Sequence, residues 1–498
     1  MTALQIVHLS FTHDSAAHPL FLDLTLHLTR GWTGVVGPNG SGKTTFLHLV
    51  QGTLQPQEGV IRGRGRLALC PQRTDDPPEG WREFLDATEA RAARLRGILG
   101  VSSEWAERWE TLSHGERKRA QIGTALWTEP DVLMVDEPTN HLDTAAMEVL
   151  QKALHEYTGI GLLVSHDRAL LDALCTNCVW LTPPAARLLP GNYSTTRELI
   201  HREDQSRAHE REVLKREIRR LEGISRDRRH EARQADAKKS KRHLHRHDSD
   251  GRAKIGLAIV SGKDGVAGKL DRQIQHRLTA KQESLASMPV KKNYTLDFWL
   301  PTGVSTRNQL FHLPAGAIPL GESATLAFPD LFMGPRDRIA LCGPNGSGKS
   351  LLVRHLLTRL TLPAARVLYL PQEIHRDESD ALLRSLKSLS NAELGTVCSV
   401  ISCLGSRPER LLESSSASPG EIRKLRLARG IALEPHLIVL DEPTNHLDLD
   451  AIELLEQALA GCPCGLLLVS HDRRFRERLT SSTWTILPGG AHHTLVPG

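Results

Sequence analysis

The chain has 498 residues, more than one hydrophobic core ordinarily organises, so two or three domains are expected. Hydrophobic residues make up 40% of it and charged residues 24%, the balance of a globular protein, and the net charge of +5 permits an anionic partner without requiring one. No run of about 18 apolar residues occurs, which excludes a membrane-spanning helix. The first residues lack the basic leader and apolar stretch of a signal peptide, so a cytoplasmic location is expected.

The eight cysteines follow no pattern of a small secreted disulfide scaffold. Cys175 and Cys178 are separated by two residues, and Cys462 and Cys464 by one proline, and both spacings are open to a zinc ion. Each pair nevertheless lies in a core-like or loop context. We therefore expect free thiols rather than a zinc site or disulfides.

The first element with distinctive chemistry is GPNGSGKT, residues 37–44. An apolar run precedes it and a helical pattern follows it, so a strand, a loop and a helix are expected in that order. Glycines in such a loop let backbone N–H groups and the helix N-terminus face phosphate groups. Lys43 is expected to reach the β- and γ-phosphates, and Thr44 to hold Mg²⁺. The strand–loop–helix context argues against an ordinary glycine-rich turn.

An acidic motif follows a second apolar run, residues 132–135, which is typical of a buried parallel strand. A carboxylate at the C-terminal end of such a strand lies beside the phosphate loop in a doubly wound fold. Asp136 is placed to bind Mg²⁺ through water, and Glu137 to polarise the water that attacks a γ-phosphate. The phosphate loop upstream disfavours the alternative of a plain surface Asp-Glu pair.

Residues 198–235 have a different composition, rich in Arg, Glu, Lys and Gln. Leu214, Ile218 and Leu221 form a narrow apolar stripe of helical spacing, and a similar stripe lies within residues 268–285. Thin apolar stripes suit a projecting hairpin better than a buried core, so two antiparallel helices joined by a tip are expected.

The tip of this hairpin carries KKSKRHLHR, residues 238–246, which contains no acidic residue. A dense cluster of Lys, Arg and His can neutralise nucleic-acid phosphates and release their counterions. Small apolar residues within residues 255–260 could approach a nucleotide surface closely. A merely solvated charged face is the alternative, and for the helices it stays open.

The motifs of the first unit recur in the same order about 300 residues later. The repeated pairs are GPNGSGKT at 37–44 and GPNGSGKS at 343–350, PQ at 71–72 and 371–372, LSHGE at 112–116 and ASPGE at 417–421, DEPTNHLD at 136–143 and 441–448, and VSHDR at 164–168 and 469–473. We predict an α/β chain of two phosphate-loop domains in tandem, residues 1–190 and 294–498. A basic helical hairpin linker over residues 191–293 joins them, with its tip near 237–267.

The ordered motifs resemble those of the ATP-binding cassette ATPases over about four-fifths of the chain. That resemblance implies ATP and Mg²⁺ as ligands. It also implies that the two cassettes pair head to tail, so that each ATP lies between the phosphate loop of one cassette and the signature loop of the other. LSHGE and ASPGE correspond to signature loops, and NHLD in both halves corresponds to the D-loop.

Site residues carry over from the family by motif. The implied nucleotide-binding residues of the first cassette are Gly37, Pro38, Asn39, Gly40, Ser41, Gly42, Lys43, Thr44, Thr45, Gln72, Ser113 and Gly115. Those of the second cassette are Gly343, Pro344, Asn345, Gly346, Ser347, Gly348, Lys349, Ser350, Leu351, Gln372, Ser418 and Gly420. The implied magnesium-binding residues are Thr44, Gln72, Asp136, Ser350, Gln372 and Asp441. The implied catalytic residues are Glu137, Glu442, His166 and His471.

The resemblance divides these residues between two sites. Site one combines Lys43, Asp136, Glu137 and His166 with Ser418 and Gly420. Site two combines Lys349, Asp441, Glu442 and His471 with Ser113 and Gly115.

Two signature-loop positions depart from the family, because His114 and Pro419 stand where a glycine is usual. Proline lacks an N–H donor, so we expect site one to close less tightly on its nucleotide. Phe11 is either a ring that stacks on adenine or a core residue, and the second half offers no clear counterpart.

EPTNHLD in both halves and the long charged linker resemble the ABC-F subfamily, twin-cassette ATPases that act on ribosomes. This implies a monomer with paired cassettes that binds the ribosomal E site and contacts rRNA and tRNA through the linker. The linker would then act near the peptidyl-transferase centre, in resistance members by displacing an antibiotic. Roughly forty residues between Gln72 and the first signature loop leave no room for the arm of some housekeeping members. Roughly twenty-seven residues after His471 leave no room for a C-terminal coiled coil.

Two other functions stay open at the level of the sequence. One is a transporter ATPase subunit with separately encoded membrane partners, although a basic helical hairpin is not what such a subunit needs for docking. The other is a DNA-directed cassette ATPase, because a basic tip could also serve duplex DNA.

Overall fold

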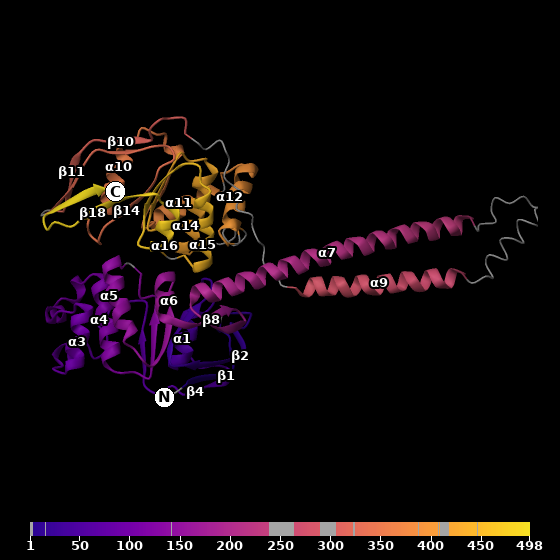
Figure 1. The fold of residues 1–498 in the computed structure, drawn as a ribbon, viewed down its shortest axis with the longest axis horizontal. Coiled ribbons are helices and arrows are strands. Elements are labelled where there is room, and N and C mark those ends of the chain that lie inside the picture. The colour runs from indigo at the N-terminus through magenta and orange to yellow at the C-terminus, as the bar shows by residue number, and fades with distance from the viewer. Residues whose placement is uncertain are drawn as a thin grey trace, which may run out of the picture. The chain divides into compact units, whose positions relative to one another are not determined.

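The computed structural model describes residues 3–14, 16–140, 142–238, 263–288, 305–321, 324–386, 388–406, 408, 418–445 and 447–498. Within the linker, side chains are described up to His230 and again from Gln273. The chain divides into two compact units, one formed by Met1–Thr196 together with Tyr294–Gly498, the other by Arg197–Asn293 (Figure 1).

The first cassette is built on a six-stranded sheet in the order β5-β6-β7-β3-β8-β9. Its neighbours are parallel except for the antiparallel pair β8–β9. A separate antiparallel sheet has the order β2-β1-β4. The strands are β1 (Ala3–Phe11), β2 (Phe21–Thr29), β3 (Gly31–Val36), β4 (Glu58–Arg62), β5 (Leu67–Cys70), β6 (Val132–Asp136), β7 (Ile160–Val164), β8 (Cys175–Thr182) and β9 (Ala185–Pro190).

Several helices of the first cassette begin at a residue whose side chain caps the helix. Ser113 caps α4 by accepting a hydrogen bond from the Glu116 backbone N–H, while the Glu116 carboxylate accepts from the Ser113 N–H. The helices are α1 (Lys43–Gln51), α2 (Trp81–Asp86), α3 (Ala90–Leu99), α4 (His114–Trp127), α5 (Thr144–His155) and α6 (Arg168–Leu174), with 3₁₀ turns at Ser103–Glu107 and Trp109–Thr111. Helix α1 packs with both sheets in one core, through Phe46 and Leu47.

The second cassette repeats this plan. Its eight-stranded sheet has the order β11-β12-β19-β18-β14-β17-β16-β15, and the last six strands correspond one by one to the six-stranded sheet of the first cassette. A two-stranded sheet, β10-β13, lies apart from it. The strands are β10 (Phe311–Leu313), β11 (Gly316–Leu320), β12 (Ala324–Phe328), β13 (Leu331–Met333), β14 (Arg338–Cys342), β15 (Val367–Leu370), β16 (Leu437–Asp441), β17 (Gly465–Val469), β18 (Ser482–Leu487) and β19 (His492–Pro497).

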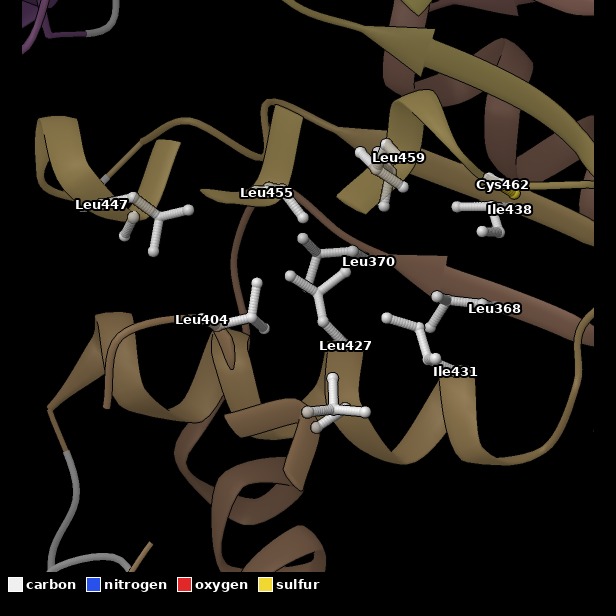
Figure 2. Close-up of a cluster of buried hydrophobic side chains, with 14 of the residues drawn as sticks. Leu368, Leu370, Leu404, Leu427, Ile431, Ile438, Leu447, Leu455, Leu459 and Cys462 are labelled. Atoms are coloured by element: carbon white, nitrogen blue, oxygen red, sulfur yellow. The ribbon is translucent and has the colours of Figure 1, made fainter. Parts of the chain in front are cut away.

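Side chains from helices cover the parallel part of this sheet. Figure 2 shows Leu370 of β15 between Leu427 of α14 and Leu455 of α15, and Leu368 of β15 beside Ile431 of α14, all fully or nearly fully buried. Burying such a side chain is worth roughly 1.5–3 kcal/mol, so this layer holds the signature helix α14 against the sheet. The helices are α10 (Lys349–Arg359), α11 (Arg376–Leu386), α12 (Asn391–Cys403), α14 (Pro419–Ala432), α15 (Leu449–Ala460) and α16 (Arg473–Leu479), with a 3₁₀ turn at Ala364–Arg366.

The linker unit contains two long helices, α7 (Tyr193–Lys238) and α9 (Lys263–Ser287). Gln275 Nε2 donates to Ser225 Oγ at 2.8 Å, and Lys281 Nζ lies 2.9 Å from Glu217 Oε2. The partners advance along α9 as they retreat along α7, so the helices run antiparallel. Ile218, from the predicted apolar stripe, is buried. The expected helical hairpin is confirmed.

Most of the predicted tip, including residues 239–246 and 255–260, lies outside the described residues. Among the helices that the structure describes, none combines the length and the apolar character needed to cross a membrane.

Candidate active sites

Each phosphate loop connects a central strand to a helix, β3 to α1 and β14 to α10. Gly42 is the N-cap of α1 with φ of 86°, where a side chain is strained, and a Cβ placed there would lie 2.6 Å from Leu20 Cδ2. Lys43 Nζ donates to the carbonyl oxygens of Gly37 and Pro38 at 2.9 and 3.2 Å. The ammonium group is therefore held over its own loop.

The second loop has the same geometry. Lys349 Nζ donates to the carbonyl oxygens of Gly343 and Pro344 at 2.8 and 3.0 Å. Gly348, the N-cap of α10, has φ of 94°. Ser41 and Ser347, at the corresponding point of each loop, are both buried.

A hydroxyl and a carboxylate meet beside each loop. Thr44 Oγ1 donates to Asp136 Oδ2 at 2.9 Å, and Asp136 ends strand β6 with 3% of its surface exposed. Asp441 ends β16 with 1% exposed, and the Ser350 side chain is its hydrogen-bonding neighbour. Burial raises the pKa of both carboxyl groups. Oxygen donors of this kind are what Mg²⁺ prefers.

The next residue in each cassette is a glutamate in a strained backbone conformation. Glu137 and Glu442 have φ of 44° and 49°, in the left-handed region. Their N–H groups donate to the carbonyl oxygens of Val164 and Val469, across to strands β7 and β17. Burial raises the pKa of Glu137 to about 7 and that of Glu442 to about 8. Each carboxylate is thus fixed at the end of the sheet.

A histidine faces each glutamate. His166 Nε2 lies 3.0 Å from Glu137 Oε1, and His471 Nε2 lies 3.5 Å from Glu442 Oε1. Burial, followed by the charge of the phosphate-loop lysine, lowers the pKa of His166 to about 3 and that of His471 to about 4. Both imidazoles are therefore neutral at pH 7, and each can serve as a hydrogen-bonding group.

Aspartates after the acidic motifs reach across to the opposite cassette. Asp448 Oδ2 accepts a hydrogen bond from the Asn39 N–H at 2.8 Å, and Asp143 Oδ2 accepts from the Asn345 N–H at 3.2 Å. The other oxygen of each carboxylate caps the helix that follows it, α15 or α5. Each phosphate loop is therefore tied to the D-loop segment of the other cassette.

Two cavities of about 550 and 560 Å³ lie where the cassettes meet. The first is lined by Asn39, Gly40, Gly42, Lys43, Thr44, Thr45, Gln72, Asp136, Glu137 and His166 together with Ser418, Pro419 and Gly420. The second is lined by Asn345, Gly346, Gly348, Lys349, Ser350, Leu351, Gln372, Asp441, Glu442 and His471 together with His114. Each cavity thus combines one phosphate loop with the opposite signature loop.

The two signature loops contribute different residues to the cavities that they line. Ser418 caps α14, and Pro419 is the first residue of that helix. Ser113 caps α4 in the same way, and an added Cβ at Gly115 would lie 3.0 Å from Leu142 Cδ2. From the first signature loop it is His114 that lines the second cavity, with Nδ1 3.2 Å from Thr74 Oγ1.

The structure decides between the two alternatives for Phe11 in favour of a core residue. Phe11 is 6% exposed and belongs to the core, where its ring packs edge-on against His13 at 5.0 Å. His13 lines the first cavity instead, with Nε2 3.3 Å from Thr45 Oγ1. His13 lies two residues beyond the end of β1, so strand periodicity gave no signal for it.

Comparison with known proteins agrees with this geometry. The family model described as "ABC transporter" matches residues 21–140 and 330–445. The chain is 30% identical to the ribosome protection protein VmlR of Bacillus subtilis, over 93% of this chain and 83% of that protein. It is 27% identical to the tylosin resistance ATP-binding protein TlrC of Streptomyces fradiae, over 90% and 91%. It is 31% identical to the ATP-binding protein Uup of Caulobacter vibrioides, over 94% and 74%.

Solved structures share the tandem fold. The archaeal ribosome recycling factor aABCE1, in a complex with the stalk protein aP1, superposes with a TM-score of 0.61 at 19% identity, covering 98% of this chain and 89% of that one. At this identity the likeness concerns the fold. Paired phosphate loops, signature loops and carboxylates, together with these relatives, place the chain in the ABC-F subfamily of the ATP-binding cassette ATPases.

Proposed function

We propose that this ATPase is an ABC-F translation factor of the ribosome-protection type. It binds ATP and Mg²⁺ in both cavities, binds the ribosome at the E site, and uses its linker near the peptidyl-transferase centre to displace an antibiotic. The observation that carries the proposal is the pair of composite cavities within a chain whose cassettes are joined by a charged helical hairpin.

The residues of each cavity divide the work of hydrolysis. Lys43 and Lys349 bind the β- and γ-phosphates, and the N–H groups of their loops face the same phosphates. Glu137 and Glu442 orient the attacking water and accept its proton, a role that their raised pKa values suit. Neutral His166 and His471 donate a hydrogen bond to the γ-phosphate from beside the glutamate.

The oxygen donors beside the loops fit Mg²⁺. Thr44 and Asp136 hold it in site one with Gln72, and Ser350 and Asp441 hold it in site two with Gln372. The burial of Asp136 and Asp441 next to these hydroxyls supports this assignment. When bound, Mg²⁺ neutralises charge that develops on the phosphate oxygens.

Closure of each site requires the opposite cassette. Ser418 and Gly420 meet the nucleotide of site one, and Ser113 and Gly115 meet that of site two. The hydrogen bonds of Asp448 and Asp143 to the opposite phosphate loops support this pairing within one chain. A monomer therefore supplies both halves of both sites.

The ribosome is the partner that the chemistry of the linker and the relatives favour. VmlR is named as a ribosome protection protein and TlrC as a tylosin resistance protein. The basic residues 238–246 suit phosphate groups of rRNA and tRNA, and the apolar residues within 255–260 suit a closer approach to the catalytic centre. The charged helices between them and the cassettes serve as the spacer.

Co-sedimentation tests this proposal against its competitors. The chain carrying Glu137→Gln and Glu442→Gln is incubated with ATP and cell extract, then centrifuged through sucrose. We expect it in the 70S fraction, and we expect RNase but not DNase to release it. Recovery with membranes would indicate a transporter subunit, and release by DNase alone would indicate a DNA-directed ATPase; either outcome overturns the proposal.

A further inference from the structure

A buried lysine in α4 contacts the backbone beside the proposed catalytic residues of site one. Lys118 is 4% exposed, and its Nζ donates to the Pro71 carbonyl at 2.6 Å and to the Asp136 carbonyl at 3.3 Å. The first carbonyl directly precedes Gln72, and the second belongs to the peptide bond that leads into Glu137. The Lys118 ammonium group therefore holds the backbone next to Gln72 and the backbone next to Glu137.

A glutamine one turn further along α4 supports the same arrangement. Lys118 Nζ also donates to Gln121 Oε1 at 3.0 Å, and Gln121 Nε2 donates to the Arg73 carbonyl at 3.3 Å. The carbonyls on both sides of Gln72 are thus held by α4. A buried ammonium is costly unless its protons find acceptors, and here all three donor directions are used.

The second cassette has a different cation at the same place in the repeat. Arg423 lies five residues after Ser418, as Lys118 lies five residues after Ser113. It is 3% exposed, its Nη1 donates to the Glu442 carbonyl at 3.0 Å, and its Nη2 donates to the Gln372 carbonyl. In both cassettes a basic residue therefore joins the glutamine loop to the backbone at the strand end, at Asp136 in the first and at Glu442 in the second.

The helix that carries each cation also closes the opposite site. Helix α4 begins at His114, which lines the second cavity, while Lys118 holds the backbone carbonyls of Pro71 and Asp136 beside the first. Helix α14 begins at Pro419, which lines the first cavity, while Arg423 holds the machinery of the second. The distance along the helix between the two contacts is little more than one turn.

We propose that Lys118 and Arg423 are positioning residues that couple the two ATP sites. Each fixes the glutamine loop and the general base of its own site, and links them rigidly to the signature loop that closes on the other nucleotide. A change in the glutamine loop on ATP binding in one site is then passed to the signature contact of the other. This inference rests on the proposed roles of Gln72 and Glu137 in site one.

Single-site backgrounds separate this coupling from a structural role. In the Glu442→Gln chain the remaining turnover reports on site one, and in the Glu137→Gln chain it reports on site two. Lys118→Met keeps the length of the side chain and removes its donors. We expect kcat in the Glu442→Gln chain to fall at least about tenfold, because small misplacements of catalytic groups are this costly. In the Glu137→Gln chain we expect KM for ATP to rise severalfold with a smaller change in kcat.

Lys118→Arg is the rescue variant, because the second cassette already uses arginine at this position. We expect it to restore most of the kcat of site one and to return the KM of site two close to its value in the parent chain. Lys152→Met, an exposed lysine of α5, is the matched control and should leave both sites unchanged. Tm and the binding of a fluorescent ATP analogue are measured on every variant. If Lys118→Met does not fold, Lys118→Gln, which keeps one donor, takes its place.

Two results overturn the proposal. One is a loss of Tm in Lys118→Met without any loss of kcat in site one. The other is a loss confined to site one, with the parameters of site two unchanged. If the parent Glu442→Gln chain itself retains the full turnover of the unmodified protein, the assigned role of Glu442 is at fault and not the coupling.

Discussion

Glu137 and Glu442, the proposed general bases, combine a strained backbone with a buried carboxylate. A non-glycine residue in the left-handed region costs on the order of 1–3 kcal/mol and persists only when its surroundings enforce it. Glu137 and Glu442 both adopt this conformation, and a hydrogen bond from each backbone N–H to the neighbouring strand holds them in it. The same conformation recurs in both cassettes at the residue that follows the strand-ending aspartate.

Replacing both glutamates by glutamine tests their role as general bases. The amide keeps the shape of the side chain but cannot accept a proton from water, so turnover should fall by a factor of about 10²–10⁴. ATP binding should survive, because the phosphate loops are unchanged. ATPase rate and nucleotide affinity measured on the double variant check this. Near-normal turnover in that variant would refute the assignment.

The signature loops predict unequal sites. Pro419 begins α14 without an N–H donor, whereas His114 keeps its N–H at the same position of α4. We expect site one, which Pro419 faces, to hydrolyse ATP more slowly than site two. Glu442→Gln alone should then cost more total turnover than Glu137→Gln alone. Pro419→Gly should narrow the gap. Equal losses, or a larger loss from Glu137→Gln, would contradict this asymmetry.

Sequence spacing predicted the phosphate loops and the carboxylates because each is a short motif whose chemistry depends on local order. The histidines were implied by the resemblance to the cassette ATPases. Lys118 and His13 were not predicted, for a physical reason. A lysine in a helix is ordinarily a solvated surface residue, and only the fold shows that this one lies under the glutamine loop. His13 lies after the end of a strand, where no periodicity sets the direction of a side chain.

At the scale of elements, the first turn of α7 is held by both cassettes. Tyr193 is 2% exposed, its ring stacks on Trp180 of β8 at 5.8 Å, and its hydroxyl donates to Glu453 of α15 at 2.7 Å. The Ser194 hydroxyl donates to Asp172 of α6, and Arg474 of α16 donates to both. Helices α6 and α16 directly follow His166 and His471, so the start of the linker helix contacts the elements that follow the two proposed γ-phosphate contacts.

Removing this clamp should uncouple the linker from the ATPase cycle. Arg474→Ala removes the bonds from α16 to Asp172 and Ser194, so ribosome stimulation of ATPase activity should fall severalfold. Basal turnover should stay within about twofold, because no nucleotide-site residue is changed. Arg473→Ala is the control, since Arg473 is 75% exposed and pairs only within its own helix in the described structure, an interaction worth about 0.3–0.5 kcal/mol. Equal stimulation in both variants would rule out the clamp.

Helical spacing predicted the paired helices of the linker because Leu214, Ile218 and Leu221 can meet a partner only on one side. The antiparallel sheets were not predicted. Strand β1 alternates too irregularly to identify its pairing, since its register with β2 and β4 shifts at several points. Pairing of β12 with β19 joins residues far apart in the chain, which no local pattern encodes.

At the scale of the whole molecule, duplication gives one chain two complementary halves. Each cassette alone carries a phosphate loop without the signature loop that completes its cavity, and the second cassette supplies what the first lacks. The sequence repeat predicted equivalent folds for the two halves, because corresponding motifs recur in the same order, and the resemblance to the cassette ATPases implied that they pair head to tail. The linker is the part that has no counterpart in either repeat, so the function beyond ATP hydrolysis is expected to reside there.

The basic tip is expected to bind RNA phosphates, which makes its contribution dependent on salt. Replacing Lys238, Lys239, Lys241 and Arg242 with alanine should weaken ribosome binding, and each lost phosphate contact should remove roughly 0.7–0.9 from the slope of log affinity against log salt. Basal ATPase activity should change little. Deleting residues 255–260 should instead spare binding and impair the effect on translation.

A charge-matched control distinguishes the tip from the net charge of the hairpin. The control replaces four exposed arginines of α7, namely Arg216, Arg219, Arg220 and Arg226. Both variants lose four positive charges, so a general electrostatic effect would flatten the salt dependence equally in both. A specific contact at the tip requires a larger change in the tip variant. If ribosome affinity in that variant is unchanged at every salt concentration, residues 238–246 do not contact RNA and act as a solvated spacer between two cassettes.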